Sequence, residues 1–301
     1  MSEKPFLTIS FLYAGVFMNI KFKLILPSIV FLFIGLLFFL AIRTLPITMP
    51  PELNNMLMMG LIACAFLFFL SKRMLRYESI ELSVVHLKPN KTTFLRLLIG
   101  LIIGAIIVGV MLYTVFTLTN LNLNRVESQT MAPFLLAVSA FIPLALMEEL
   151  LFRGYPFFRL TQTINIRWVL LITAILFALY HYNGTASVSS LLIGPGVWGV
   201  TFGVAAYLSK SIAVPLGMHI STNVLQAIFG LKSRYVPMWE VEQSTKIETF
   251  IEPTQLGIAM QIVLLVISII VLEISLYRRK SMHKKVANIH LNMMNEKVLK
   301  K

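Results

Sequence analysis

The sequence has few charged residues, a single cysteine and no aspartate. Only 13% of its 301 residues are charged while 57% are hydrophobic, and the mean hydropathy is +0.83, which excludes an ordinary soluble protein and predicts a polytopic membrane protein. Cys64 lies in an apolar run, so no disulfide framework can form, and the redox compartment stays undetermined. The net charge of +13 resides at the ends of apolar runs and in the tail, a distribution typical of membrane topology signals, and we expect no nucleic-acid partner.

Runs of about 20 apolar residues predict transmembrane helices. We expect an all-α, polytopic helix bundle of about eight such helices with its catalytic site in the bilayer. An even number places both termini on one side, and the basic loops assign that side to the cytoplasm. We expect an integral membrane protein, with the cell (plasma) membrane of a bacterium as its location. The predicted spans are Leu24 to Ile42, Leu53 to Leu70, Leu95 to Leu118, Met131 to Phe152, Trp168 to His181, Leu191 to Leu208, Ile212 to Phe229 and Leu256 to Tyr277.

These spans suggest five regions. The segment Phe6 to Ile20 is apolar but short and lacks a small-residue cleavage site, so residues 1–23 are predicted to be an interfacial or re-entrant segment and not a signal peptide. Residues 24–130 hold the first three helices, and residues 131–230 hold helices four to seven, the predicted catalytic core. Residues 231–277 form an extracytoplasmic loop and the eighth helix, and residues 278–301 a basic cytoplasmic tail.

Polar residues interrupt three of the apolar runs. Glu148 and Glu149 end the run MAPFLLAVSAFIPLALMEELLFR, His181 ends LLITAILFALYHYN, and His219 and Asn223 lie within AVPLGMHISTNVLQAIF. Ionisable groups at membrane depth are costly and are usually functional. At about 1.5 Å per residue, Glu149 lies roughly 16 Å, His181 roughly 24 Å, and His219 and Asn223 roughly 12 and 18 Å from the cytoplasmic ends of their helices. Tilted helices could bring all of them together, with the carboxylate pair on the cytoplasmic side of the site.

At these positions the sequence resembles the CPBP family, the CAAX-protease and bacteriocin-processing intramembrane proteases also called Abi. Three signatures occur in order: E-E-x-x-x-R from Glu148 to Arg153, F-x-x-x-H from Phe177 to His181, and H-x-x-x-N from His219 to Asn223. The resemblance covers about residues 131–229. It implies a CAAX-protease-like endopeptidase that cleaves a membrane-associated protein or peptide within or beside the bilayer. The implied catalytic residues are Glu148, Glu149, His181, His219 and Asn223, with Arg153 and Phe177 in support.

The carboxylate pair supplies the candidate base. An apolar pocket disfavours the charged form of a carboxylate, which makes it a better proton acceptor for water. Because successive helical residues point about 100° apart, only one of the two can face the histidines squarely. We expect Glu149 to be the base and Glu148 to support it. Arg153 is spaced i, i+4 from Glu149, however, so an ion pair between them would leave Glu148 as the base.

A metal ion is the second open question. Glu149, His181 and His219 could bind Zn²⁺ with a position left for water, so Zn²⁺ is a candidate cofactor. Asn223 is a poor zinc ligand but a good donor to an oxyanion, and the sequence has no HExxH pair. We therefore favour glutamate-activated water over a metal-bound one.

Each polar residue alone has a simpler interpretation. The glutamates could mark a helix end at the interface, and the histidines and Asn223 could bond between helices as structural contacts. Together they favour an enzyme, but two other functions stay open. One is a non-catalytic scaffold or bacteriocin immunity protein. The other is a proton-coupled transporter, although no internal repeat supports it. Besides the lipid bilayer, the expected partner is a membrane-associated substrate whose identity the sequence does not give.

Overall fold

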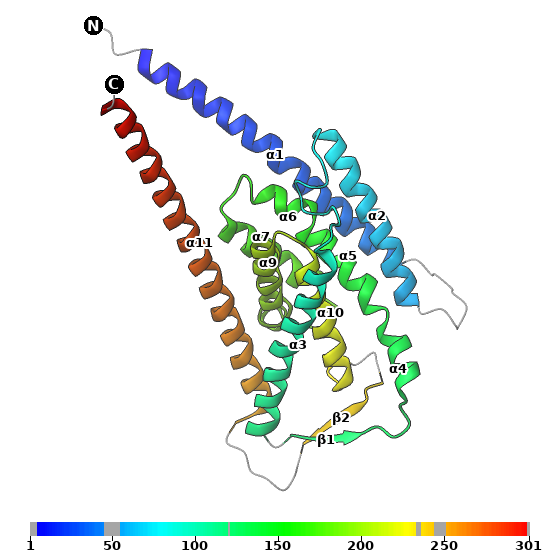
Figure 1. The fold of residues 1–301 in the computed structure, drawn as a ribbon. Helices are drawn as coiled ribbons and strands as arrows, with labels where there is room; N and C mark the ends of the chain where they lie inside the picture. Colours follow the sequence, from blue (N-terminus) through cyan, green and yellow to red (C-terminus); the bar gives the residue numbers. More distant parts are fainter. Residues whose placement is uncertain (1–4, 45–54, 120, 233–235, 244–250, 300–301) are drawn as a thin grey trace.

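Helices make up almost all of the chain that the structure describes (Figure 1). The structure is a computed structural model and describes residues 5–44, 55–119, 121–232, 236–243 and 251–299. The prediction of an all-α helix bundle is confirmed. The helices are α1 (Pro5–Thr44), α2 (Asn55–Tyr77), α3 (Thr93–Leu118), α4 (Met131–Val138), α5 (Phe141–Arg153), α6 (Tyr155–Leu160), α7 (Ile166–Tyr180), α8 (Val188–Leu191), the π-helical turn η1 (Leu192–Gly196), α9 (Val197–Ser209), α10 (Ala213–Ile228) and α11 (Pro253–Leu299).

Every predicted span coincides with a helix or a helical pair, but the helices differ in length. Six are long and apolar enough to cross a membrane: Ile25–Thr44, Asn55–Tyr77, Thr93–Leu118, Met131–Leu160, Val188–Ser209 and Pro253–Val286. Within the described residues, six of the about eight expected spans meet this criterion of length and composition. The other two correspond to α7, with 15 residues, and α10, with 16. These two short helices carry or immediately precede the histidines and Asn223. The protein is an integral membrane protein.

The N-terminal segment continues directly into the first span. Helix α1 begins at Pro5 and runs for 40 residues, so the segment expected to be separate is the first half of one helix. Its position at the membrane interface stays a prediction. In Figure 1 the start of α1 and the end of α11 lie at the same end of the bundle.

Two short strands, which the hydropathy pattern did not predict, lie at the opposite end of the bundle (Figure 1). Strand β1 (Leu121–Arg125) pairs antiparallel with β2 (Trp239–Gln243), with Leu121 opposite Gln243 and Arg125 opposite Trp239. Both sequences, LNLNR and WEVEQ, alternate apolar and polar residues, a pattern typical of strands. The pair joins the loop after α3 to the loop after α10.

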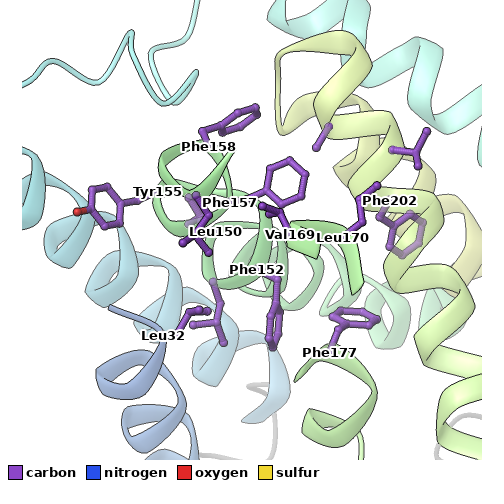
Figure 2. Packing of buried hydrophobic residues seen from close by; sticks show 14 of the residues in the cluster. Leu32, Leu150, Phe152, Tyr155, Phe157, Phe158, Val169, Leu170, Phe177 and Phe202 are labelled. Atoms are coloured by element: carbon purple, nitrogen blue, oxygen red, sulfur yellow. The ribbon is translucent and has the colours of Figure 1, made fainter. Parts of the chain in front are cut away.

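The hydrophobic core is centred on α5 and α6, and every residue of α6 is buried. Phe152 meets Phe177 of α7 edge to face, with ring centroids 5.3 Å apart, and Phe177 meets Phe202 of α9 at 6.4 Å. Figure 2 shows these three rings together with Leu32 from α1 and Leu150 from α5. Aromatic and aliphatic packing of this kind fixes the positions of the neighbouring polar residues.

Helix α10 lies unusually close to α3. A Cβ atom placed on Gly217 would lie 2.2 Å from the Leu97 carbonyl oxygen, and one on Gly100 would lie 2.1 Å from that of Val214. A Cβ on Gly104 would lie 2.5 Å from the Met218 carbonyl oxygen. Small residues allow such close packing between membrane helices. The backbone of α10, and with it His219, is therefore held directly against α3.

A buried ion pair joins the core to the loop between α2 and α3. Arg159 of α6 donates from Nε and Nη2 to Glu78 at 3.1 and 2.6 Å, and the Tyr155 hydroxyl donates to the same carboxylate at 2.7 Å. The two charged side chains are almost fully buried. This contact holds the loop that follows α2 against the end of the central helices.

Candidate active site

The two adjacent glutamates of α5 have different surroundings. The Glu149 side chain is completely buried, whereas that of Glu148 is 12% exposed and lines a cavity. This is the asymmetry that helix geometry requires of neighbouring residues. One carboxylate points into the protein and the other toward open space.

Glu149 is held by two partners. Its Oε1 atom lies 3.3 Å from Arg153 Nη1 and 3.0 Å from His219 Nδ1. Arg153 is also fully buried, donates from Nη2 to the Gly199 carbonyl at 3.0 Å, and lies 4.2 Å from the centroid of the Phe177 ring. The predicted i, i+4 ion pair thus exists, and it connects α5 with α7, α9 and α10.

His181 is the cap residue at the C-terminal end of α7. Its Nδ1 lies 2.8 Å from the Phe177 carbonyl oxygen, and because a carbonyl can only accept, Nδ1 carries the proton. The other nitrogen, Nε2, lies 3.8 Å from Glu148 Oε2. The spacing of the second motif therefore has a physical reason: the backbone of Phe177 orients the ring of His181.

His219 faces Glu148 from the other side. While its Nδ1 contacts Glu149, its Nε2 lies 3.6 Å from Glu148 Oε2. Phe202 stacks on the ring at a centroid distance of 4.7 Å. Glu148 Oε2 is buried and has no hydrogen-bond partner among the described residues. Two histidine nitrogens thus approach one unpaired carboxylate oxygen.

Two cavities meet at these residues. The larger has a volume of about 650 Å³ and is lined by Glu148 together with other residues of α5 and with residues of α1, α2, α7 and α10. The smaller, about 220 Å³, extends toward α9 and is bounded by Gly194 and Pro195 of η1. Both are lined by His181, His219, Asn223 and Lys232. Asn223 therefore belongs to the cluster because it lines the same cavities, one helical turn beyond His219.

Three lining residues were not predicted to belong to the site. Arg43 at the end of α1, Lys232 after α10 and Tyr180 at the end of α7 all line the larger cavity together with Glu148. Burial lowers the pKa of Lys232, and the Glu148 carboxylate partly offsets this effect. In the sequence both cations looked like ordinary span-flanking charges, so only the packing of α1 and α10 reveals their position.

The expected zinc ligands do not form a preformed metal site. Glu149 Oε1 contacts both Nδ1 of His219 and Nη1 of Arg153. His181 lies next to Glu148 and not next to Glu149. Within the described part of the chain, no three His, Cys or Glu side chains are grouped so that they could hold a metal ion. The expected set of Glu149, His181 and His219 therefore does not fit a zinc ion, and we derive no step through a metal.

Comparison with known families identifies the same segment. Residues 129–225 match the family described as type II CAAX prenyl endopeptidase Rce1-like. No curated protein matches the chain. The matched residues include all three motifs and every residue of the Glu148, Glu149, His181, His219 and Asn223 cluster. The match supports, at the level of the family, a CAAX-protease-type intramembrane endopeptidase. It confirms the resemblance that the motifs indicate: residues 129–225 are similar to the CAAX-type intramembrane endopeptidases.

Proposed function

We propose that the protein hydrolyses a peptide bond in a membrane-associated substrate, with Glu148 as the general base. One observation carries this assignment. Glu148 Oε2 is unpaired among the described residues, faces a cavity, and lies 3.6 and 3.8 Å from the Nε2 atoms of His219 and His181. A buried water molecule needs several polar partners, and the Glu148 carboxylate and the two histidine nitrogens beside the cavity supply them.

Glu149, the base expected from the sequence, receives a different role. Its side chain is fully buried, and Arg153 and His219 occupy its Oε1 atom. A carboxylate that accepts a hydrogen bond from a histidine orients that ring. Glu149 is therefore a positioning residue that acts through His219, and Arg153 in turn holds Glu149.

The proposed reaction needs only groups of this chain and water. Glu148 removes a proton from water while the water oxygen attacks the carbonyl carbon of the scissile peptide. The carbonyl oxygen becomes an oxyanion. The Asn223 amide is one donor to it, and His219, on the same helix face, is the other through Nε2 when the ring is an imidazolium, because Nδ1 already donates to Glu149. Glu148 then returns the proton to the leaving amine as the C–N bond breaks. His181 orients the attacking water.

The cavity suits a peptide segment that is partly apolar. Its walls include Phe39, Met56, Phe141 and Leu144, which would contact apolar side chains of the substrate. Arg43 and Lys232 add positive charge near its edge. Since the matched family is described as acting on CAAX prenyl proteins, a lipid-modified peptide is one candidate substrate and an unmodified membrane peptide another.

The charge distribution indicates the side from which the substrate enters the larger cavity. Arg43, Asn183 and Leu231 are exposed residues of the larger cavity. They lie at the ends of α1, α7 and α10 that are remote from the basic loops at Lys72 and Lys210. By the positive-inside rule the basic loops are cytoplasmic, so we propose that the substrate reaches Glu148 from the extracytoplasmic side.

A cleavage assay tests the catalytic proposal. Purified protein in detergent is incubated with a farnesylated CAAX peptide and with a set of unmodified transmembrane peptides, and products are identified by mass spectrometry. We expect Glu148→Gln to lower the rate by at least about 100-fold because the base is lost. Glu149→Gln should retain measurable cleavage, and a chelator should leave the wild-type rate unchanged.

Glu127→Gln is the matched control, since Glu127 is an exposed glutamate in the loop after β1. It should cleave at the wild-type rate, and all variants should melt cooperatively. Cleavage at an unchanged rate by Glu148→Gln would refute the assignment of the base. Absence of any product with folded wild-type protein would instead favour the non-catalytic scaffold.

Cysteine labelling tests the side of access. In a Cys64→Ala background, which has no other cysteine, Leu231→Cys should react with a membrane-impermeant maleimide in intact cells. Lys91→Cys, in the exposed loop between α2 and α3, should react only after the cells are permeabilised. The reverse pattern would place the cavity on the cytoplasmic side and would leave the catalytic assignment unaffected.

A further inference from the structure

A second large cavity lies at the end of the bundle remote from the Glu148 cavity mouth. It has a volume of about 720 Å³ and is bounded by α2, the loop between α2 and α3, the start of α3, α5 and the start of α10. None of its residues belongs to the proposed catalytic cluster. The cavity combines a basic rim with an apolar interior, and each part indicates one half of a ligand.

The rim is strongly basic. His86, Lys88, Arg96 and Lys210 line it, and no acidic residue does so among the described residues. Burial together with Lys210 and Arg96 lowers the pKa of His86, which shows that these cations act on a common volume. The cavity also includes Thr93, the first residue of the 26-residue helix α3, whose first turn has no acidic side chain. Helix N-termini favour anions.

The interior is apolar. Phe68 and Ala65 of α2, Leu146 and Leu150 of α5, and Leu216 of α10 line it. Phe68 is 38% exposed on the outer face of α2, so the cavity borders the surface that lipids cover. A free inorganic anion would use the rim but leave this apolar part unfilled. A ligand with a charged head and an apolar chain would use both.

The position of the cavity along the membrane normal agrees with such a ligand. Helix α2 leaves its apolar run at Ser71 and Lys72, and α3 begins at Thr93, so the basic rim lies where two spans reach the membrane interface. Phosphate groups of the lipid leaflet occupy that level, and basic residues there attract anionic headgroups. We propose that this cavity binds one anionic phospholipid, with its phosphate at Lys88, Arg96 and Lys210 and an acyl chain beside Phe68 and Leu150.

The bound lipid would contact the two helices, α5 and α10, that carry residues of the proposed catalytic site. Leu150 directly follows Glu149 on α5, and Leu216 lies about one turn before His219 on α10. A ligand that binds only the folded protein stabilises it. Lipid binding should therefore raise the melting temperature whether or not the protein is a protease.

The test uses the purified full-length protein in detergent. Phosphatidylglycerol, phosphatidylcholine with the same acyl chains, and inorganic phosphate are each titrated, and native mass spectrometry and melting temperature are recorded. We expect phosphatidylglycerol to bind at least about 10-fold more tightly than phosphatidylcholine. Inorganic phosphate at the same concentration should not shift the melting temperature.

Variants locate the site. Arg96→Gln with Lys210→Gln should weaken phosphatidylglycerol binding by about 10- to 30-fold, and Lys88→Gln, at an exposed residue, by about 5-fold. Arg73→Gln with Lys91→Gln removes two exposed cations near this end of the bundle that do not line the cavity, and it should bind like the wild type. Arg96→Lys with Lys210→Arg keeps the charge and should retain binding.

Three results would overturn the proposal. Equal affinity for the two phospholipids would show that the rim does not recognise charge. Unchanged binding by the Arg96 and Lys210 double variant and by Lys88→Gln would place the lipid elsewhere. A melting shift of equal size with inorganic phosphate would indicate a simple anion site that does not use the apolar interior.

Discussion

The outer and inner helices of this bundle differ in length, burial and chemistry. Only 17% of the apolar window of α3, and of α11, is buried inside the protein, whereas 56% is buried in Met131–Leu160 and in Val188–Ser209. The outer helices present long apolar surfaces such as Ile102, Ile106 and Ile262. The inner ones include Glu149, Arg153 and Arg159 among their buried residues.

The difference separates two tasks within one membrane protein. The outer helices need only to be stable in contact with lipid, and sufficient length and hydropathy provide this. The inner helices must also bury polar groups. Each buried charge therefore needs a partner, and the helices must pack at defined distances from one another. The comparison predicts that equal substitutions will have unequal effects in the two regions.

The largest expected difference concerns two arginines in ion pairs. Arg153→Met removes the cation that pairs with Glu149, at 3.3 Å between fully buried side chains. Removing one partner of a buried pair typically costs about 3–5 kcal/mol. We expect a large loss of thermal stability in detergent together with a reduced cleavage rate, because Arg153 no longer holds the Glu149 carboxylate that orients His219.

Arg167→Met is the matched substitution at the outer surface. Its partner Glu273 on α11 lies 2.6 Å away, but both side chains are about half exposed. Exposed pairs contribute little to stability, so the melting temperature and the cleavage rate should change only slightly. Similar melting temperatures for the two variants would show that burial of the Arg153 pair does not decide its contribution. Adding Glu149→Gln to Arg153→Met should recover part of the stability but not the activity.

The same contrast explains how much the sequence could predict. Hydropathy located α2, α3 and α11, since these helices differ from their surroundings in composition. It placed the end of α3 correctly, but α2 continues to Tyr77 and α11 to Leu299, beyond the predicted ends at Leu70 and Tyr277. It also indicated the five polar residues of the proposed site, because each interrupts an apolar run. The two remaining predicted spans correspond to α7 and α10, which have only 15 and 16 residues and are therefore shorter than a typical span.

The roles within the carboxylate pair depended on information that lies outside the motif. Helix geometry required Glu148 and Glu149 to face different directions, and the spacing to Arg153 correctly indicated an ion pair with Glu149. Which carboxylate faces the cavity depends on the rotation of α5 against α7 and α10. That rotation is set by contacts distant in sequence, such as Arg153 with the carbonyl of Gly199.

The smallest predicted effect comes from a single methyl group on one of two helical glycines. Alanine has a higher helix propensity than glycine by roughly 1 kcal/mol, and this gain is similar at both positions. Gly109 on the exposed face of α3 has nothing within 4 Å of its potential Cβ, so Gly109→Ala should be neutral or slightly stabilising. Gly217→Ala would place a methyl group 2.2 Å from the Leu97 carbonyl oxygen.

Because backbone cannot move aside as a flexible side chain can, α10 must shift away from α3 in Gly217→Ala. We expect a loss of about 1–3 kcal/mol from overpacking and a reduced cleavage rate, since His219 follows two residues later on the same helix. Thermal melts and rates measured side by side for the two variants test this. If Gly217→Ala melts like Gly109→Ala, the close contact of α3 and α10 does not position His219, and inner and outer glycines are equivalent in this bundle.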